Sequence, residues 1–194
     1  MSLDIQPLTA DRWEDFEKLF GPNGACAGCW CMWWKWKRSE WDALKGTGAR
    51  EAHRSLVKAG QVTGLLAYQE GEPMGWCAVE PREHYPALNR SRVLKPVDDR
   101  PVWSVTCFFV WRSRRRKGIT LQLLRAAVAY AAAQGARIIE GYPVEPKQEK
   151  VSAVQVFTGL ASTFRQAGFR EVERRSDTRP IMRYTVKSRP HSAN

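Results

Sequence analysis

The sequence lacks any stretch of about 20 uninterrupted apolar residues, the length that a helix needs to cross a bilayer. Its first ten residues carry Asp4 and no basic block followed by an apolar one, so they lack the layout of a secretory signal. It also lacks internal repeats and low-complexity tracts. We therefore expect a cytoplasmic protein with no membrane partner.

The composition is that of one folded domain. With 194 residues, of which 43% are hydrophobic, the chain is long enough for one well-buried core and short for two. Five cysteines are an odd number, which argues against a simple disulfide framework and favours reduced thiols. We expect a single domain over residues 1–186, followed by a frayed tail at residues 187–194.

The charge balance is strongly basic. Lysine and arginine number 31 against 20 aspartate and glutamate residues, which gives a net charge of +11. Such a surface favours anionic partners, which include nucleic acid, acidic lipid and phosphorylated cofactors. Charge alone does not choose among them.

Hydrophobic periodicity predicts a mixed α/β fold with one sheet. The predicted strands are Leu3–Leu8, Thr63–Gln69, Met74–Glu80, Val102–Val110, Ala136–Tyr142, Phe169–Ser176 and Ile181–Val186. The predicted helices are Asp11–Phe20 with a Thr9 cap, Ala49–Lys58 with a Thr47 cap, a helix between Gly118 and Gly135, and Thr158–Ala167, with one further helical turn near Glu83–Leu88. The second and third strands form an antiparallel hairpin, whereas the fourth and fifth flank a helix and are expected to be parallel.

A strongly basic loop separates the strand at Val102–Val110 from the helix that follows. Five of the six residues from Arg112 to Lys117 are basic, and Gly118 stands where the helix starts. Unpaired N–H groups at a helix N-terminus bind anions, a glycine lets the backbone approach a ligand closely, and guanidinium groups complement phosphate oxygens. An isolated basic run is more often a solvated loop, but this position favours a pyrophosphate site.

Two common nucleotide-binding motifs are missing. The Walker A pattern Gly-x-x-x-x-Gly-Lys-Ser/Thr and the dinucleotide pattern Gly-x-Gly-x-x-Gly are both absent. Nucleotide hydrolysis and hydride transfer therefore lose support.

The loop and a later segment resemble the signatures of one enzyme family. Residues Arg115–Thr120, Arg-Arg-Lys-Gly-Ile-Thr, look like the Arg/Gln-x-x-Gly-x-Gly/Ala acyl-CoA loop of the GNAT superfamily of N-acetyltransferases, except that Thr120 replaces Gly or Ala. Residues Phe164–Phe169 resemble that family's late helix-to-strand signature, and the order of elements agrees. The resemblance implies a mixed sheet, splayed at its centre and flanked by helices, and an acyltransferase that uses acetyl-CoA.

The resemblance also implies where the coenzyme binds. In the family, the pantetheine arm lies in the gap where the strand before the loop and the strand after the helix splay apart. The backbone of Phe108, Phe109 and Val110 is therefore expected to hold the pantetheine. Backbone N–H groups of six successive residues are expected to bind the pyrophosphate: Arg115, Arg116, Lys117, Gly118, Ile119 and Thr120.

The groups for proton transfer depart from the family pattern. Many members place a Tyr at the start of the late signature, where this chain has Phe164, so Tyr142 is the nearest candidate for the general acid. The strand before the loop has no carboxylate, which makes Glu80 and Glu83 candidates for the general base, and His84 has a suitable ordinary pKa. The alternatives are a packing role for Tyr142 and solvated surface roles for the others.

The segment between residues 26 and 41 holds three of the five cysteines. The spacing of Cys26, Cys29 and Cys31 allows thiolates to converge on one zinc ion. A closed site needs about four ligands, however, and no second pair of Cys or His follows in the sequence, so we expect no metal.

The same segment holds five of the nine tryptophans. In the resembled family this region forms one wall of the acceptor site, which makes Trp30, Trp33 and Trp34 candidate substrate contacts. Indole faces attract cationic groups and flat rings. An aromatic plug in the core or at a dimer contact is an equal alternative.

Three functions remain open at this level. The leading prediction is transfer of an acetyl group from acetyl-CoA to a primary amine, of a small molecule in preference to a protein, by direct attack on the thioester. The second is a nucleic-acid-binding module that uses Arg112–Lys117 with tryptophans as stacking platforms. The third is an acyl-CoA sensor without turnover. We expect the first, with no nucleic-acid partner, and the family resemblance allows a homodimer.

Overall fold

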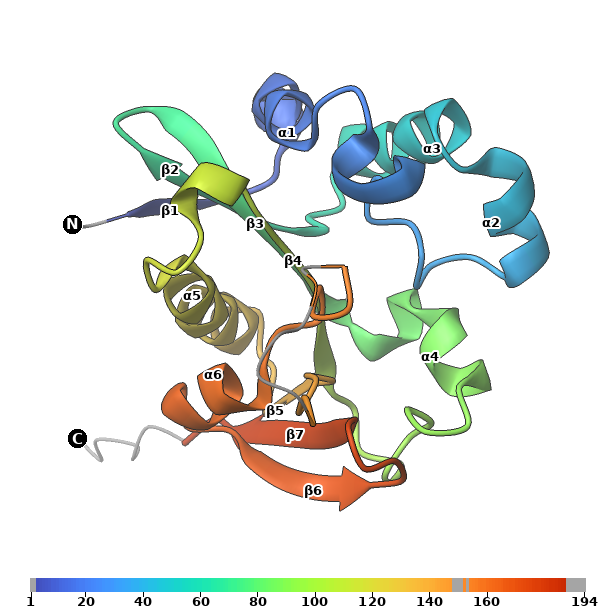
Figure 1. The fold of residues 1–194 in the computed structure, drawn as a ribbon, viewed down its shortest axis with the longest axis vertical. Coiled ribbons are helices and arrows are strands. Elements are labelled where there is room, and N and C mark those ends of the chain that lie inside the picture. The colour runs from blue at the N-terminus through green and yellow to red at the C-terminus, as the bar shows by residue number, and fades with distance from the viewer. Residues whose placement is uncertain (1–2, 148–151, 153, 188–194) are drawn as a thin grey trace, which may run out of the picture.

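The computed structural model describes residues 3–147, 152 and 154–187 of the chain (Figure 1). Its strands form one seven-stranded sheet in the order β1-β2-β3-β4-β5-β7-β6. The strands are β1 (Asp4–Pro7), β2 (Gly64–Gln69), β3 (Glu72–Pro81), β4 (Trp103–Val110), β5 (Ile138–Gly141), β6 (Arg170–Arg174) and β7 (Pro180–Thr185). The predicted mixed sheet is confirmed, with shifted strand ends. Most of the predicted tail, residues 188–194, lies outside the described residues.

Helices cover both faces of the sheet (Figure 1). They are α1 (Trp13–Phe20), α2 (Arg38–Leu44), α3 (Thr47–Lys58), α4 (Pro86–Arg90), α5 (Ile119–Ala133) and α6 (Ala161–Gln166). Leu123 of α5 packs with Val105 in the core on one face, whereas Phe16 of α1 packs with Trp76 in the core on the other. No helix in the described part of the chain is long and apolar enough to cross a bilayer.

The centre of the sheet is splayed. β4 and β5 are parallel, as predicted, but they pair only where Trp103–Val105 faces Ile139–Gly141, although β4 continues to Val110. On the other side of β4, the pairing with β3 shifts register so that Thr106 is an extra residue. A bulge of this kind bends a strand and increases its twist. The second half of β4 therefore has one edge that β5 does not cover.

Two predicted helix caps are wrong. Thr9 precedes a 3-10 turn at Ala10–Arg12 that leads into α1, and the Thr9 hydroxyl accepts a hydrogen bond from the Arg12 guanidinium at 2.7 Å and caps no backbone N–H. Thr47 is the first residue of α3 and not its cap, because Gly46, with φ of +89°, makes the turn before it. Thr9 thus stands at the predicted position without its capping hydrogen bond, whereas Gly46 takes the position predicted for Thr47.

Two other helical predictions are only partly right. The helix predicted from Thr158 begins at Ala161, because Leu160 is extended and pairs with Val144 in a short parallel bridge. The single helical turn predicted near residue 83 is a 3-10 turn, Arg82–His84, followed directly by α4.

A buried histidine couples the fold to pH. His53 of α3 is fully buried, with Nδ1 2.8 Å from the Trp30 carbonyl oxygen and Nε2 2.7 Å from the Thr63 hydroxyl. Burial lowers the pKa of His53 from its ordinary value of 6.5 to about 3. The unfolded chain therefore takes up a proton on acidification well before the folded protein does.

We expect the free energy of unfolding to fall by about 2 kcal/mol from pH ~7 to ~5, since the unfolded state gains the proton in that range. In His53→Gln, whose amide does not titrate, this component of the pH dependence is expected to vanish. Urea unfolding of both proteins at several pH values measures it. Equal pH slopes in the two proteins contradict the assignment to His53.

Candidate active site

The basic loop joins the end of β4 to the start of α5. Arg112–Arg114 form a 3-10 turn, and Arg116 and Gly118 both have left-handed φ values, +63° and +73°. Turns of this kind can aim backbone N–H groups into one concavity that binds anions. Within the described residues no side chain caps α5, so the N–H groups of its first turn are free for a ligand.

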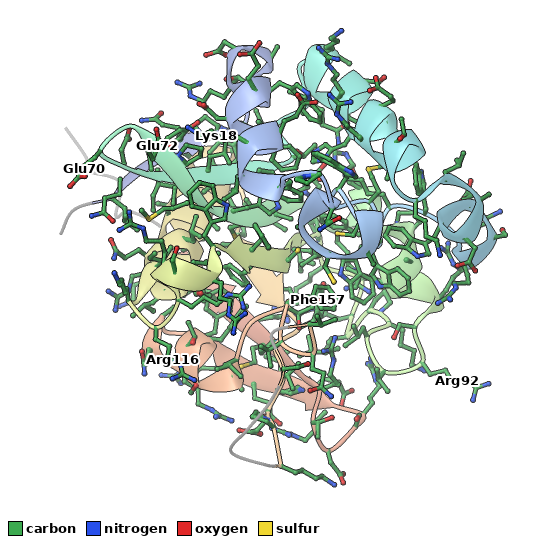
Figure 2. The ribbon with its side chains drawn as sticks, turned by 45° about the horizontal axis from the view of Figure 1, so that its top comes forward. Lys18, Glu70, Glu72, Arg92, Arg116 and Phe157 are labelled. Atoms are coloured by element: carbon green, nitrogen blue, oxygen red, sulfur yellow. The ribbon has the colours of Figure 1, made fainter. Side chains whose placement is uncertain are left out.

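The side chains of this loop keep their charge unneutralised. Arg112, Arg116 and Lys117 are exposed, and in the part of the chain that the structure describes no carboxylate pairs with them or with Arg114. Arg116 points outward at the edge of the molecule (Figure 2). Arg115 folds back instead, and its Nε donates to the carbonyl oxygen at the end of β4 at 3.0 Å. Positive charge beside a free helix start suits a diphosphate.

A cavity of about 420 Å³ connects this loop to the segment rich in cysteine and tryptophan. Arg115 and Thr120 line its loop end, residues 107–110 of β4 line its length, and Trp33 and Trp41 line its far end. The cavity thus lies along the uncovered edge of β4, between the basic loop and an aromatic wall.

Most of the predicted coenzyme residues meet at this cavity. Those that line it are Phe108, Phe109, Val110, Arg115 and Thr120. The others belong to the loop at its end: Arg116, Lys117 and Gly118, which are exposed, and Ile119, whose side chain is buried in the core.

Other parts of the chain make hydrogen bonds to the edge of β4 that does not pair with β5. The Phe108 N–H donates to the Phe157 carbonyl oxygen at 2.6 Å, and the Val110 carbonyl accepts from Arg115. The Phe157 ring, at the centre of Figure 2, stacks on Trp34 with centroids 6.2 Å apart. This edge of β4 therefore has one backbone donor, the Phe108 N–H, and one backbone acceptor, the Val110 carbonyl. The amides of a pantetheine arm require partners of both kinds.

The turn before α2 is strained. Its residues with positive φ that are not glycine are Ala25, Ala27, Trp30 and Cys31. Backbone of this kind persists only where its surroundings hold it, and it clusters at functional sites. Here packing holds it, because Trp30 stacks on Phe20 at 5.7 Å and lies directly against Gly24, where an added Cβ would come 2.4 Å from the indole. The turn brings Cys26 and Cys29 to the cavity wall.

The three tryptophans predicted to contact substrate lie in different surroundings. Trp30 is in the core, 6% exposed, and is not among the residues that line the cavity. Trp33 lines it and meets Trp41 edge-to-face, with centroids 5.1 Å apart. Trp34 covers Phe157. Sequence reasoning missed Trp41, the buried residue of α2, because this helix was not predicted from the sequence. Indoles that line a cavity or fill the core do not favour the nucleic-acid interpretation.

Two of the cysteines that line the cavity, Cys29 and Cys107, have raised pKa values. Burial raises the pKa of Cys29 to about 12, and all five cysteines are free. The Cys31 sulfur accepts a hydrogen bond from the Trp76 indole N–H at 3.2 Å. Among the described residues, no group of three His, Cys, Asp or Glu side chains is placed to hold a metal ion.

The two glutamates predicted as bases do not line the cavity. Glu80 is buried, and its carboxylate lies 2.5 Å from Lys35 Nζ, 2.5 Å from Gln61 Nε2 and 2.9 Å from His84 Nδ1. Glu83 is exposed on the turn after β3. Glu80 therefore serves first as the counter-ion of a buried lysine.

Tyr142 belongs to a buried polar network beside the paired residues of β4 and β5. Its hydroxyl donates to Glu140 at 2.8 Å, lies 2.8 Å from the Ser104 hydroxyl and accepts from the Arg82 guanidinium at 2.5 Å. Burial and the charge of Glu140 raise the pKa of Tyr142 well above its ordinary value. Arg183 Nε donates to the same glutamate at 2.7 Å. Every polar site of the phenol is used within this network.

Comparisons with known proteins identify the family of the chain. A family model described as Acetyltransferase (GNAT) family matches residues 23–150, which is more than half of the chain. A search of curated proteins by sequence finds no significant match.

Several solved structures share the fold. The PaiA N-acetyltransferase from Thermoplasma acidophilum in complex with coenzyme A is 14% identical, with 96% of this chain and 100% of that chain covered and a TM-score of 0.55. The aminoglycoside N-acetyltransferase AAC(6')-Iy in complex with CoA is 17% identical, with 89% and 91% covered and a TM-score of 0.54. A GNAT acetyltransferase from Streptococcus agalactiae is 13% identical, with 96% of each chain covered and a TM-score of 0.56. At these identities the likeness shows the fold.

Proposed function

Because the chain belongs to the GNAT acetyltransferase family, we propose that it transfers the acetyl group of acetyl-CoA to the primary amine of a small molecule. The chain is an acyltransferase by family, and acetyl-CoA is its cosubstrate. The observation that carries the proposal is the continuous cavity from the basic loop along the uncovered edge of β4 to the tryptophans. We also propose that residues 1–186 form one domain, which the single sheet from β1 to β7 supports.

Two groups of residues are proposed to hold acetyl-CoA. Backbone N–H groups from Arg115 to Thr120 bind the diphosphate at the start of α5, and exposed guanidinium groups of the loop supply charge. The edge of β4 at Phe108–Val110 binds the pantetheine in place of the Phe157 carbonyl and the Arg115 side chain. A cosubstrate held this way directs its thioester toward the tryptophans.

Attack on the thioester needs stabilisation of the oxyanion that forms. The proposed donor is a backbone N–H group of the splayed part of β4 other than that of Phe108, because the Phe108 N–H is assigned to the pantetheine. As the C–N bond forms and the C–S bond breaks, coenzyme A leaves as a thiolate, which we propose takes its proton from water. The incoming amine must also be neutral. Among the described residues that line the cavity there is no carboxylate and no histidine, so we propose that the amine loses its proton through water, with Glu83 or the Glu80–His84 pair as acceptors outside the cavity.

Turnover with a panel of primary amines tests the proposal. Since the protein has free cysteines, the acetylated amine is quantified by mass spectrometry in place of a thiol reagent. We expect acetyl-CoA to be consumed in step with the acetylated product. Tight binding of acetyl-CoA by calorimetry without acetylation of any amine would identify the sensor instead.

The double variant Arg116→Ala/Lys117→Ala is expected to raise the KM for acetyl-CoA about tenfold, a loss of about 1.4 kcal/mol, and to leave kcat within about twofold. Both side chains are exposed, so the fold does not depend on them. Arg92→Ala is the matched control, because Arg92 is exposed on the opposite side of the molecule (Figure 2). Equal KM values for acetyl-CoA in the variant and the control would show that the charges of Arg116 and Lys117 do not contribute to acetyl-CoA binding.

A further inference from the structure

The end of the cavity away from the basic loop has aromatic walls. Trp33 and Trp41 meet edge-to-face there, with an angle of 86° between their planes, and Phe157 and Phe109 also line the cavity. Arg38 covers one face of Trp33, with its guanidinium carbon 5.5 Å from the ring centroid. A ligand here meets ring faces and edges that favour flat apolar groups.

The same lining has no negative charge. Among the described residues that line the cavity, Arg115 at the loop end is the one charged side chain. Burial raises the pKa of Cys29 to about 12, and a hydrogen bond with Cys31 together with burial raises the pKa of Cys107. These thiols are therefore uncharged at neutral pH, and they provide no counter-ion for an ammonium group.

The carboxylates that lie nearest to Trp33 and Trp41 in the sequence already have partners. Glu40 accepts the Lys37 backbone N–H at 2.7 Å at the start of α2, and Asp42 pairs with Arg38 Nε at 2.8 Å. Glu80 is held by Lys35, as described above. A ligand with several positive charges would therefore find the Arg38 guanidinium at this wall and no free carboxylate in the described lining.

From these contacts we infer that the acceptor is a monoamine with an aromatic or otherwise apolar body, such as an arylalkylamine, and not a polyamine or an aminosugar; this inference rests on the proposed function. One ammonium group can be stabilised on an indole face, whereas a second ammonium group would lose its hydration without gaining a counter-ion. An apolar site also favours the neutral form of the amine, which is the nucleophile.

Competition between amine classes tests the inference. The kcat/KM values for tryptamine and 2-phenylethylamine are expected to exceed those for spermidine and neamine by about 100-fold or more, which is about 2.7 kcal/mol. Equal or higher values for the polycations overturn the inference and leave the proposed function standing. Acetylation of none of these amines, together with no binding of acetyl-CoA by calorimetry, contradicts the proposed function itself.

Two matched pairs of variants test whether this wall of the cavity determines the preference among amines. Cys26 is exposed on the cavity wall, so Cys26→Asp adds the missing carboxylate, and Cys26→Asn is the reference of equal size. We expect Cys26→Asp to shift the preference toward spermidine about tenfold relative to Cys26→Asn. Trp33→Ala is expected to lower kcat/KM for tryptamine about tenfold or more, and Trp33→Phe to lower it less, with the KM for acetyl-CoA within about twofold in both.

Stability measurements on the two pairs distinguish a changed amine preference from a loss of folded protein. Thermal unfolding of each variant is measured beside its kinetics, and only variants that unfold within a few degrees of the parent are compared. A preference that is identical in Cys26→Asp and Cys26→Asn, or a tryptamine kcat/KM that does not respond to Trp33→Ala, overturns the assignment of this wall to the acceptor.

Discussion

Replacing Gly118 with valine is expected to abolish acetyl-CoA binding, with an affinity loss of about 100-fold or more, while the protein remains folded. Gly118 precedes α5 with φ of +73°, a conformation that a β-branched residue adopts only at a cost of about 1–2 kcal/mol. An added Cβ meets no protein atom within 4 Å, so the new side chain extends into the open space beside the helix start. That space is where the diphosphate is proposed to lie. Calorimetric titration with acetyl-CoA measures the loss.

Gly135→Val is the matched control for this variant. Gly135 follows the other end of the same helix, also has a left-handed φ, +91°, and also has open space where a Cβ would be. The two variants are expected to lose similar stability, and only Gly118→Val is expected to lose the cosubstrate. An affinity that is unchanged in Gly118→Val, or reduced equally in both, contradicts the proposed diphosphate site.

Glu140→Ala is expected to lower the free energy of unfolding by about 3–5 kcal/mol, because it leaves two nearly buried cations without their shared partner. Glu140 of β5 is fully buried and contacts the guanidinium groups of Arg82, at 3.0 Å, and Arg183, at 2.7 Å, whose side chains are 11% and 5% exposed. The network ties the turn after β3 to β5 and β7. Urea unfolding followed by circular dichroism measures the change.

Two milder variants divide this network into its parts. Glu140→Gln keeps the shape without the charge and is expected to lose less stability than Glu140→Ala. Tyr142→Phe removes one hydroxyl with three partners and is expected to cost about 1–3 kcal/mol with kcat preserved. A loss below about 1 kcal/mol in Glu140→Ala contradicts the role of the network. A kcat that falls tenfold in Tyr142→Phe, with stability unchanged, would instead support Tyr142 as the general acid.

The strands and most helices of the fold were predictable because their signals are local, whereas α2 (Arg38–Leu44) was not predicted. Apolar runs bounded by turn residues marked every strand, and the unit of strand, loop, helix and strand predicted the parallel pair of β4 and β5. The caps at Thr9 and Thr47 could not be predicted, since the Thr9 hydroxyl binds the Arg12 side chain and Gly46 makes the turn before Thr47. The register shift at Thr106 has no local signal, because it depends on how β3 pairs with β4.

The candidate site was predictable only in its loop. Gly118 and the arginines before it are consecutive, so their chemistry is visible in the sequence. Which tryptophan lines the cavity depends on the positive φ of residues in the turn before α2, and that turn sends Trp30 inward and leaves Trp33 and Trp41 on the cavity wall. The surroundings of Tyr142 could not be predicted either, because its partner Arg82 lies 60 residues earlier in the chain.

The Phe157 carbonyl accepts the Phe108 N–H, so in the proposed binding mode a coenzyme amide replaces one hydrogen bond of this donor with another and releases the Phe157 carbonyl. Such an exchange changes the free energy by no more than about 1 kcal/mol. The same exchange in reverse accompanies departure of the spent coenzyme, when the protein's own carbonyl takes back the vacated donor. Product release limits the rate of many enzymes. In the proposed binding mode, the return of the Phe157 carbonyl to the Phe108 N–H favours release of the spent coenzyme.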